Sequence, residues 1–243
     1  MTERQGRITR LFVDTELRPQ ASLELPEAAA HHAVRVLRLR EGDAVVLFDG
    51  RGGEYDALLS MPGRNRVSAE IRERRDLERE SPLAVTLVQA ISTSDKMDLT
   101  VQKAVELGAV AIHPVFSEKS VVRLSGEREA KKLAHWRRIA IAACEQCGRN
   151  RIPEIREPVA LDRYRAPAGF KILLSPSGAG RLTDHAKGPL AVAAGPEAGF
   201  SDEEEQGLLR AGFAAVRLGP RVLRTETAAL AALAALNALA GDF

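Results

Sequence analysis

Cysteine, lysine in the first third of the chain, and long apolar runs are all scarce in this 243-residue sequence. Two cysteines, Cys144 and Cys147, cannot build a disulfide framework. Their C-x-x-C spacing is half of a zinc-ribbon signature, with no second pair, and it falls where a helix is expected to end. Packed thiols are therefore favoured over metal or redox work, and we predict no metal site.

The other absences concern membranes and familiar phosphate sites. No uninterrupted apolar run approaches membrane-spanning length, and the charged first ten residues lack the apolar core of a secretory signal, which predicts a cytoplasmic protein without a membrane partner. The sequence has no G-x-x-x-x-G-K-[ST] loop, no G-x-G-x-x-G after a strand and no G-x-S-x-G elbow. These gaps argue against the common nucleotide-binding and hydrolase classes.

Charge is distributed unevenly although the net formal charge is only +2. Residues 1–81 contain no lysine, and their arginines and acids nearly balance. The basic excess lies in residues 119–165, where it would suit a polyanion such as RNA. A solvated helical face would give the same composition, so charge alone favours that simpler interpretation.

Short strand patterns dominate the chain up to residue 81. A helical pattern over Pro26–Leu39 interrupts them, with His31, His32, Arg35 and Arg38 on its polar side. Strands separated by Gly-rich turns predict a small β-barrel or sandwich, and charged Arg72–Ser81 is the expected linker. The strands are expected over Arg10–Asp14, Ser22–Leu25, Ala44–Phe48, Tyr55–Leu59 and Val67–Ile71.

A different pattern begins at Pro82. Leu83–Ile91 reads as a strand buried on both faces, and from there strands alternate with helices, including a long one over Lys131–Cys147. His113, inside an expected buried strand, reads as a core residue. Alternation of this kind predicts a mostly parallel α/β sheet in residues 82–243.

Three Gly/Pro loops follow apolar strand-like runs near the end of the chain. They are Ser175–Arg181, Gly195–Phe200 and Leu218–Ala228. Ser201 with Glu204 forms a capping-box pattern after the second loop, and Thr225 is placed to cap the terminal Ala/Leu helix. Because open α/β sheets bind ligands where strands exit, three such loops together predict a ligand site.

Two charged clusters resist a purely structural explanation. A proline turn and a capped helix do not account for Arg221, Arg224 and Glu226 in one tight loop, and arginines beside a Gly-rich turn suit phosphate or carboxylate. The stretch ACEQCGRNR at 143–151 could cap a helix end or present a guanidinium to RNA, and both interpretations stay open.

These motifs together resemble the SPOUT class of RNA methyltransferases and, more narrowly, the RsmE family. The resemblance runs nearly end to end and departs in Ala198, where the family usually has glycine, and in the weakly matched loop Ser175–Gly180. It is carried by RLF, HHAVRVLRLREGD, LFDG, DKMDLTVQKAVELG, IHPVFSEKSVV, ACEQCGRNRIPEI, GPEAGF and LGPRVLRTETA.

The resemblance implies a PUA-like RNA-binding barrel in residues 1–81 and, in residues 82–243, a SPOUT domain with helices on both faces of its sheet and a deep trefoil knot. It implies S-adenosylmethionine as methyl donor, a homodimer, and N3 methylation of a uridine in 16S ribosomal RNA, with the assembled small subunit as the expected substrate. The cofactor-binding residues carried over from the family are Leu174, Ser175, Gly195, Pro196, Glu197, Gly199, Leu218, Gly219, Arg221, Val222, Leu223, Arg224 and Thr225.

Methylation of uracil N3 requires loss of the N3 proton, which suggests catalytic roles. We expect Arg224 to supply cationic stabilisation and Glu226 to orient it or accept the proton, with Glu145 as the alternative base. The expected RNA-gripping residues are Arg10, Arg35, Arg38 and Arg149. Alternatives are a SPOUT enzyme acting on another RNA, a non-catalytic RNA-binding assembly factor, and an α/β nucleotide-binding enzyme unrelated to RNA.

Overall fold

The computed structural model describes residues 8–63, 66–185 and 188–243, which form two compact units. The first comprises residues up to Glu80 together with Cys144–Ile152, and the second comprises Ser81–Ala143 and Pro153–Phe243. A boundary at residue 81 leaves Cys144–Ile152 in the second domain, whereas its contacts belong to the first. Tertiary hydrogen bonds explain the difference, because Asn150 Nδ2 donates to the carbonyl of Leu77 and Arg149 pairs with Glu80.

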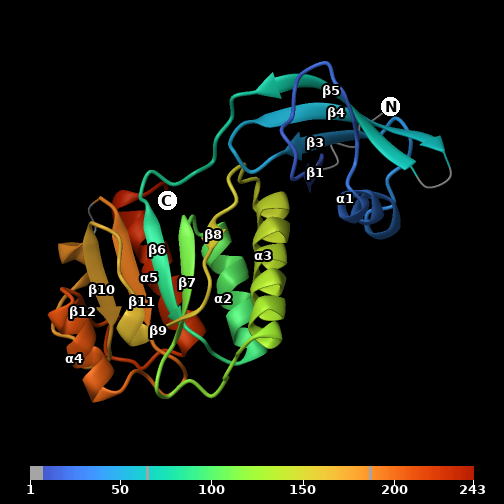
Figure 1. Ribbon diagram of the computed structural model, residues 1–243. Helices are drawn as coiled ribbons and strands as arrows, with labels where there is room; N and C mark the ends of the chain where they lie inside the picture. The colour runs from blue at the N-terminus through green and yellow to red at the C-terminus, as the bar shows by residue number, and fades with distance from the viewer. Residues whose placement is uncertain (1–7, 64–65, 186–187) are drawn as a thin grey trace. The chain divides into compact units, whose positions relative to one another are not determined.

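The first unit contains a five-stranded sheet (Figure 1). Its buried apolar side chains form one core. The strand order is β1-β3-β4-β5-β2, in which β1 and β3 are parallel and the other neighbours antiparallel. Alternation along β5 sends Val67, Ala69 and Ile71 into the core. The bounds are β1 Thr9–Phe12, β2 Ser22–Glu24, β3 Ala44–Phe48, β4 Glu54–Gly63 and β5 Arg66–Arg75. The expected strands are confirmed, although β4 and β5 run longer than predicted.

The helix expected over Pro26–Leu39 is shorter and irregular. Helix α1 (Glu27–His31) continues as a π-helical turn η1 (His32–Val36). Arg38 then adopts φ +57°, a left-handed conformation that ends the helical run.

Glu54 organises the charge inside the first unit. Its side chain is 1% exposed and contacts three guanidinium groups, those of Arg10, Arg75 and Arg79. Burial acts to raise the pKa of Glu54, but hydrogen bonds from Arg79 and Arg10 outweigh it and hold the pKa below its ordinary value. A carboxylate this buried is tolerated only because it is paired.

The second unit is a seven-stranded sheet in which every pair is parallel. The order is β12-β10-β11-β6-β7-β8, with β9 also pairing β7. This confirms the predicted parallel α/β sheet. The bounds are β6 Val85–Ala90, β7 Ala111–Phe116, β8 Glu154–Ile155, β9 Val159–Ala160, β10 Phe170–Leu174, β11 Leu190–Ala194 and β12 Ala214–Val216.

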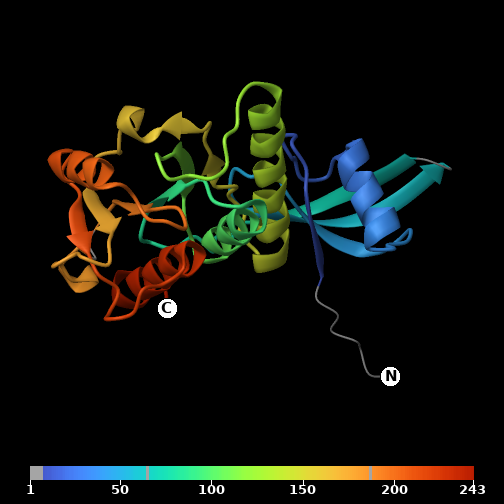
Figure 2. The same cartoon turned by 90° about the horizontal axis from the view of Figure 1, so that it is seen from below.

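Helices cover both faces of this sheet. Helices α2 (Ser94–Glu106) and α5 (Thr225–Ala240) lie side by side on one face, and α4 (Asp202–Arg210) lies on the other (Figures 1 and 2). Helix α3 (Glu127–Cys147) begins four residues before the predicted Lys131 and is joined to α2 by His135 Nε2 and Asp98 Oδ2, 2.7 Å apart. Among the described residues, no helix is long and apolar enough to cross a membrane.

Two expected helix caps have different outcomes. Ser201 and Glu204 form the predicted reciprocal capping box at the start of α4. Thr225, however, is the first residue of α5 rather than its cap, which is Arg224. The Thr225 hydroxyl instead donates to the carbonyl of Gly195. That bond comes from tertiary packing and is invisible in the local sequence.

Replacing Glu54 with glutamine should destabilise the protein by about 3 kcal/mol, because Arg10 would then be buried without a counter-charge. Since the folded-state pKa of Glu54 is lowered, its stabilisation is present above the ordinary value of 4.5 and is lost as pH falls through the folded-state pKa. The wild type should therefore lose more stability between pH 6 and pH 3 than Glu54→Gln, as measured by urea denaturation. Glu24→Gln, at an exposed carboxylate of β2, is the control. Equal acid sensitivity of wild type and Glu54→Gln would contradict the assignment.

Candidate functional site

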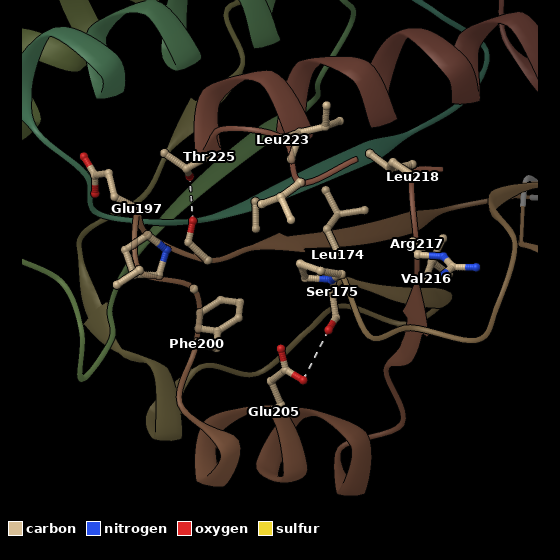
Figure 3. Close-up of a pocket in the computed structure, with 18 of the residues that line it drawn as sticks. Leu174, Ser175, Glu197, Phe200, Glu205, Val216, Arg217, Leu218, Leu223 and Thr225 are labelled. Atoms are coloured by element: carbon tan, nitrogen blue, oxygen red, sulfur yellow. Dashed lines mark hydrogen bonds between the residues drawn. The ribbon is translucent and has the colours of Figure 1, made fainter. Parts of the chain in front are cut away.

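A cavity of about 250 Å³ lies in the second unit where β10, β11 and β12 end, close to the size of small-molecule sites (Figure 3). The three predicted loops form its walls together with the beginning of α5. It is lined by Leu174, Ser175, Pro176, Ala194, Gly195, Pro196, Glu197, Ala198, Gly199, Phe200, Glu205, Val216, Arg217, Leu218, Arg221, Val222, Leu223, Thr225 and Ala228.

The first loop is held against β12 by backbone hydrogen bonds. Ser175 N donates to the carbonyl of Val216, and Gly180 N donates to the carbonyl of Ala215. A Cβ atom at Gly178 would lie 2.8 Å from backbone atoms of Ala215 and Val216, so only glycine permits this approach. The loop that matched the family most weakly thus has a firm structural role.

The second loop turns back on itself directly after β11. Gly199 N donates to the carbonyl of Pro196, and Gly199 adopts φ +72°, which favours glycine. Ala198 has no positive φ, so an alanine fits there without backbone strain. The departure from the family pattern at this position is therefore accommodated.

The Glu197 carboxylate is bound to the start of α2 rather than free. Its Oε1 accepts hydrogen bonds from Thr93 N, Thr93 Oγ1 and Lys96 Nζ, all at 3.1 Å. Partial burial acts to raise the pKa of Glu197, but these donors hold it below its ordinary value. Figure 3 shows Glu197 set apart from Ser175 and Glu205. The Glu197 side chain therefore fixes the loop, and Glu197 is one of the residues that line the cavity.

Thr225 joins the second and third loops. Its hydroxyl donates to the Gly195 carbonyl at 2.5 Å (Figure 3). The same hydroxyl accepts a hydrogen bond from Gln89 Nε2 at 2.9 Å. Gln89 is fully buried in β6 and Thr225 is 7% exposed. Both groups depend on this chain of bonds, because a buried polar group left without a partner is costly.

Ser175 and Glu205 provide two of the polar side chains that line the cavity. Ser175 Oγ lies 2.9 Å from Ser177 Oγ and 3.3 Å from Glu205 Oε2, which reaches it from α4 (Figure 3). Sequence reasoning missed Glu205, since it is one of four acids in the first turn of α4 and only Glu204 carries a capping signal. It also missed the apolar lining residues Phe200 and Val216.

The cavity brings together all the predicted cofactor-binding residues except Gly219 and Arg224. Gly219 serves the turn, with φ +80°. Arg224 is exposed at the cap of α5. Glu226 is half-buried, and its Oε2 is buried without a hydrogen-bond partner in the described part of the chain. Arg224 and Glu226 thus flank Thr225 without lining the cavity.

Glu145, the alternative base, belongs to the first unit. Its Oε1 accepts a hydrogen bond from Phe12 N at 2.9 Å, and burial raises the pKa of this carboxyl. It does not line the cavity. In the structure, Glu145 provides the hydrogen-bond acceptor for the backbone amide of Phe12 in β1.

Arg10 and Arg149 are not available to grip RNA as expected. The Arg10 guanidinium contacts Glu54 and Asn150 and lies 4.8 Å from the centre of the Phe48 ring. Arg149 is 3% exposed and forms a bidentate salt bridge with Glu80. Both are internal ion-pair residues, and this corrects the prediction for them. Arg35 and Arg38 are exposed, as an RNA contact requires.

Cys144 and Cys147 lie in the last turn of helix α3, where Cys144 is buried and Cys147 is partly exposed. Cys144 is buried, burial raises its pKa to about 12, and its thiol donates to the Arg151 carbonyl. The thiol therefore stays protonated and unreactive at neutral pH.

Comparison with known proteins assigns the class. A family model described as an RNA methyltransferase domain matches residues 79–237, and one described as an RNA methyltransferase PUA domain matches residues 25–72. The chain therefore belongs to the RNA methyltransferases that carry an N-terminal PUA domain.

Comparison with individual relatives identifies a narrower family. The ribosomal RNA small subunit methyltransferase E of Buchnera aphidicola (subsp. Acyrthosiphon pisum) is 32% identical, over 98% of this chain and 96% of that protein. Its namesake from Mycobacterium bovis is 36% identical over 86% of this chain and 83% of that protein. The chain is a member of this ribosomal RNA small subunit methyltransferase E family.

Solved structures agree with this assignment. A Legionella pneumophila methyltransferase with bound S-adenosylmethionine superposes with a TM-score of 0.95 at 40% identity, over 98% of this chain and 100% of the other. The small subunit methyltransferase E of Neisseria gonorrhoeae, bound to S-adenosylmethionine, gives 0.93 at 43% identity with the same coverage.

Thr225→Val should lower stability by about 2 kcal/mol, because valine has the same shape but leaves Gln89 and the Gly195 carbonyl without their partner. Thr225→Ser keeps the hydroxyl and should stay within about 1 kcal/mol of the wild type. Urea denaturation measures both changes. A valine variant as stable as the serine variant would contradict a structural role for the hydroxyl.

Proposed function

We propose that this protein transfers a methyl group from S-adenosylmethionine to N3 of a specific uridine in 16S ribosomal RNA of the small subunit. The observation that carries the proposal is the single cavity formed by the three strand-exit loops, in a chain similar over nearly its full length to enzymes solved with S-adenosylmethionine. The parallel sheet supports it, since ligands bind at the carboxyl ends of such strands.

The residues of the cavity fit the methyl donor. Leu174, Leu218 and Leu223 offer apolar surface for an adenine ring. Ser175 and Glu205 offer a hydroxyl and a carboxylate for the hydroxyl or ammonium groups of such a ligand. When bound, S-adenosylmethionine supplies a methyl group on a positively charged sulfur, which needs no further activation. The loops therefore act by positioning, which can lower a barrier by roughly 7–11 kcal/mol at best.

Methylation also requires removal of the proton on N3 of the uracil. A bond forms between N3 and the methyl carbon as the methyl–sulfur bond breaks, and the N3 proton must pass to a base. We assign Glu226 as that base, because it directly follows Thr225 of the cavity wall and its Oε2 is buried without a hydrogen-bond partner among the described residues. Arg224 would stabilise negative charge developing on the uracil oxygens.

The same proposal includes a homodimer, a knotted second domain and action in the cytoplasm. Support for a dimer comes from α5, which is almost wholly Ala and Leu and carries Leu239 at 49% exposure, because a helix apolar all round normally has a covered face. Sedimentation equilibrium would measure the oligomeric state.

The proposal also divides the chain at residue 81 into a PUA domain and a methyltransferase domain. The exposed Arg35 and Arg38 of the PUA domain would contact RNA.

Incubation with tritiated S-adenosylmethionine and small subunits that lack the modification should label 16S ribosomal RNA at one position. Nucleoside mass spectrometry should identify N3-methyluridine there. Label at another atom or in transfer RNA would replace the substrate but keep the enzyme class. No label in any RNA despite cofactor binding would favour a non-catalytic assembly factor.

Glu226→Gln should lower kcat by about 10²- to 10⁴-fold, the usual contribution of a general base. Its residual rate should rise with pH, since more uracil is then already deprotonated. Single-turnover rates at several pH values measure this, with Glu203→Gln, at an exposed acid of α4, as control. If Glu226→Gln and Glu145→Gln both keep near-normal turnover, the proton passes to solvent.

A further inference from the structure

The edge strand beside β7 in the second unit is interrupted. Strand β8 pairs with the start of β7 and β9 with its end, while Arg156, Glu157 and Pro158 lie between them. Proline cannot donate to a strand ladder, which fits this break. An open hollow of about 460 Å³ is found here, lined by His113, Arg137, Glu154, Arg156, Glu157, Val159, Arg163, Tyr164 and Arg165.

Two largely buried aromatic side chains contribute to the hollow. His113 is 9% exposed and Tyr164 is 7% exposed. Their rings pack edge to face, with ring centroids 5.2 Å apart. The Tyr164 hydroxyl is buried and has no hydrogen-bond partner within the described ranges. Burial lowers the pKa of His113, so its ring is neutral at pH 7. The lack of a partner for the Tyr164 hydroxyl among the described residues is unusual, because buried hydroxyl groups normally form hydrogen bonds.

Four arginines surround these rings, and most of their charge is not neutralised locally. Arg137 and Arg165 donate to backbone carbonyls, which orient a guanidinium without cancelling its charge. Arg156 pairs with Glu154 at 2.9 Å. Arg163 has no ion pair with any residue that the structure describes. Among the described residues, Glu157 is the only other acid that lines the hollow, so the four arginines leave this lining with a net positive charge.

This combination suits a phosphate group. Guanidinium forks bind phosphate oxygens in two-pronged fashion, and a tyrosine hydroxyl adds one neutral donor. Small nucleotides are usually enclosed by the pockets that bind them. An open hollow on a sheet edge is better suited to a nucleic-acid backbone that passes over it. It also gives a use to the basic segment 119–165, whose charge excess the cofactor cavity does not employ.

We propose that the Arg137–Arg163–Arg165 hollow binds one or two backbone phosphates of the substrate RNA, at a site separate from the cofactor cavity. The proposal rests on the assigned function as an RNA methyltransferase. Such contacts hold the RNA in register without reading its sequence.

The test compares full-length Arg163→Gln/Arg165→Gln with a matched double variant, Arg128→Gln/Arg138→Gln, at two exposed arginines of α3 outside the hollow. Binding of in vitro transcribed 16S ribosomal RNA is measured against salt concentration. The hollow variant should bind several-fold to about tenfold more weakly, with the slope of log K against log salt reduced by about 1 to 2. The control should show a smaller change in both. Tyr164→Phe should weaken binding about two- to fivefold with the slope unchanged, since it removes only a neutral donor.

Calorimetry with S-adenosylmethionine separates this inference from the proposed function. Cofactor affinity should be equal in all variants, and the hollow variant should show a raised KM for RNA with kcat unchanged. If the wild type methylates RNA and the hollow variant binds RNA as well as the control does, the inference fails and the function stands. If no RNA is methylated but the difference in RNA binding is present, the function fails and the inference stands.

Titration with inorganic phosphate distinguishes the two sources of a phosphate group. An RNA-backbone site should give no saturable heat at millimolar phosphate. Saturable heat that the hollow variant loses would assign the hollow to a free phosphorylated metabolite and overturn the RNA proposal. Unchanged RNA binding without phosphate binding would instead point to an acidic segment of a protein partner.

Discussion

The buried hydrogen-bond chain from Gln89 through Thr225 to the Gly195 carbonyl holds the candidate active site together. It connects the central strand β6, the exit of β11 and the first residue of α5. Hydrogen bonds are stronger in a low-dielectric interior, and the cost of breaking them is correspondingly higher. Glu197, bound to the start of α2, fixes the opposite side of the same loop. Hydrogen bonds therefore anchor two of the cavity's loops to the core of the sheet, which suits catalysis by positioning.

Buried or partly buried carboxylates hold four arginines of the first unit in ion pairs. Arg10, Arg75 and Arg79 surround Glu54, and Arg149 pairs with Glu80. The planar guanidinium fork forms such pairs better than an ammonium group, which gives a physical reason for arginine without lysine in this segment. Positive charge in the sequence is consequently a poor measure of RNA-binding surface. Only arginines that keep unneutralised charge at the surface remain available.

The second unit carries two concave features on one sheet. The carboxyl ends of β10, β11 and β12 form the cavity lined by the three loops, and the broken edge beside β7 forms the arginine hollow. A parallel sheet makes both features possible, since its strand ends gather loops from distant parts of the chain while its edge strand can be interrupted without disturbing the core.

The sequence by itself determined the main strands and helices apart from the irregular helix α1, together with the capping box of Ser201 and Glu204 and the loops around Gly195 and Leu218. These depend on local periodicity and turn chemistry, which neighbouring residues encode. Tertiary structure alone decided which polar groups meet. Gln89 and Thr225 are 136 residues apart, and Arg10 and Asn150 are 140 apart. For this reason the cap expected of Thr225, the RNA contacts expected of Arg10 and Arg149, the place of Glu205 in the cavity and the hollow beside His113 could not be read correctly from local pattern. The partner of a polar side chain is set by the packing of the whole chain.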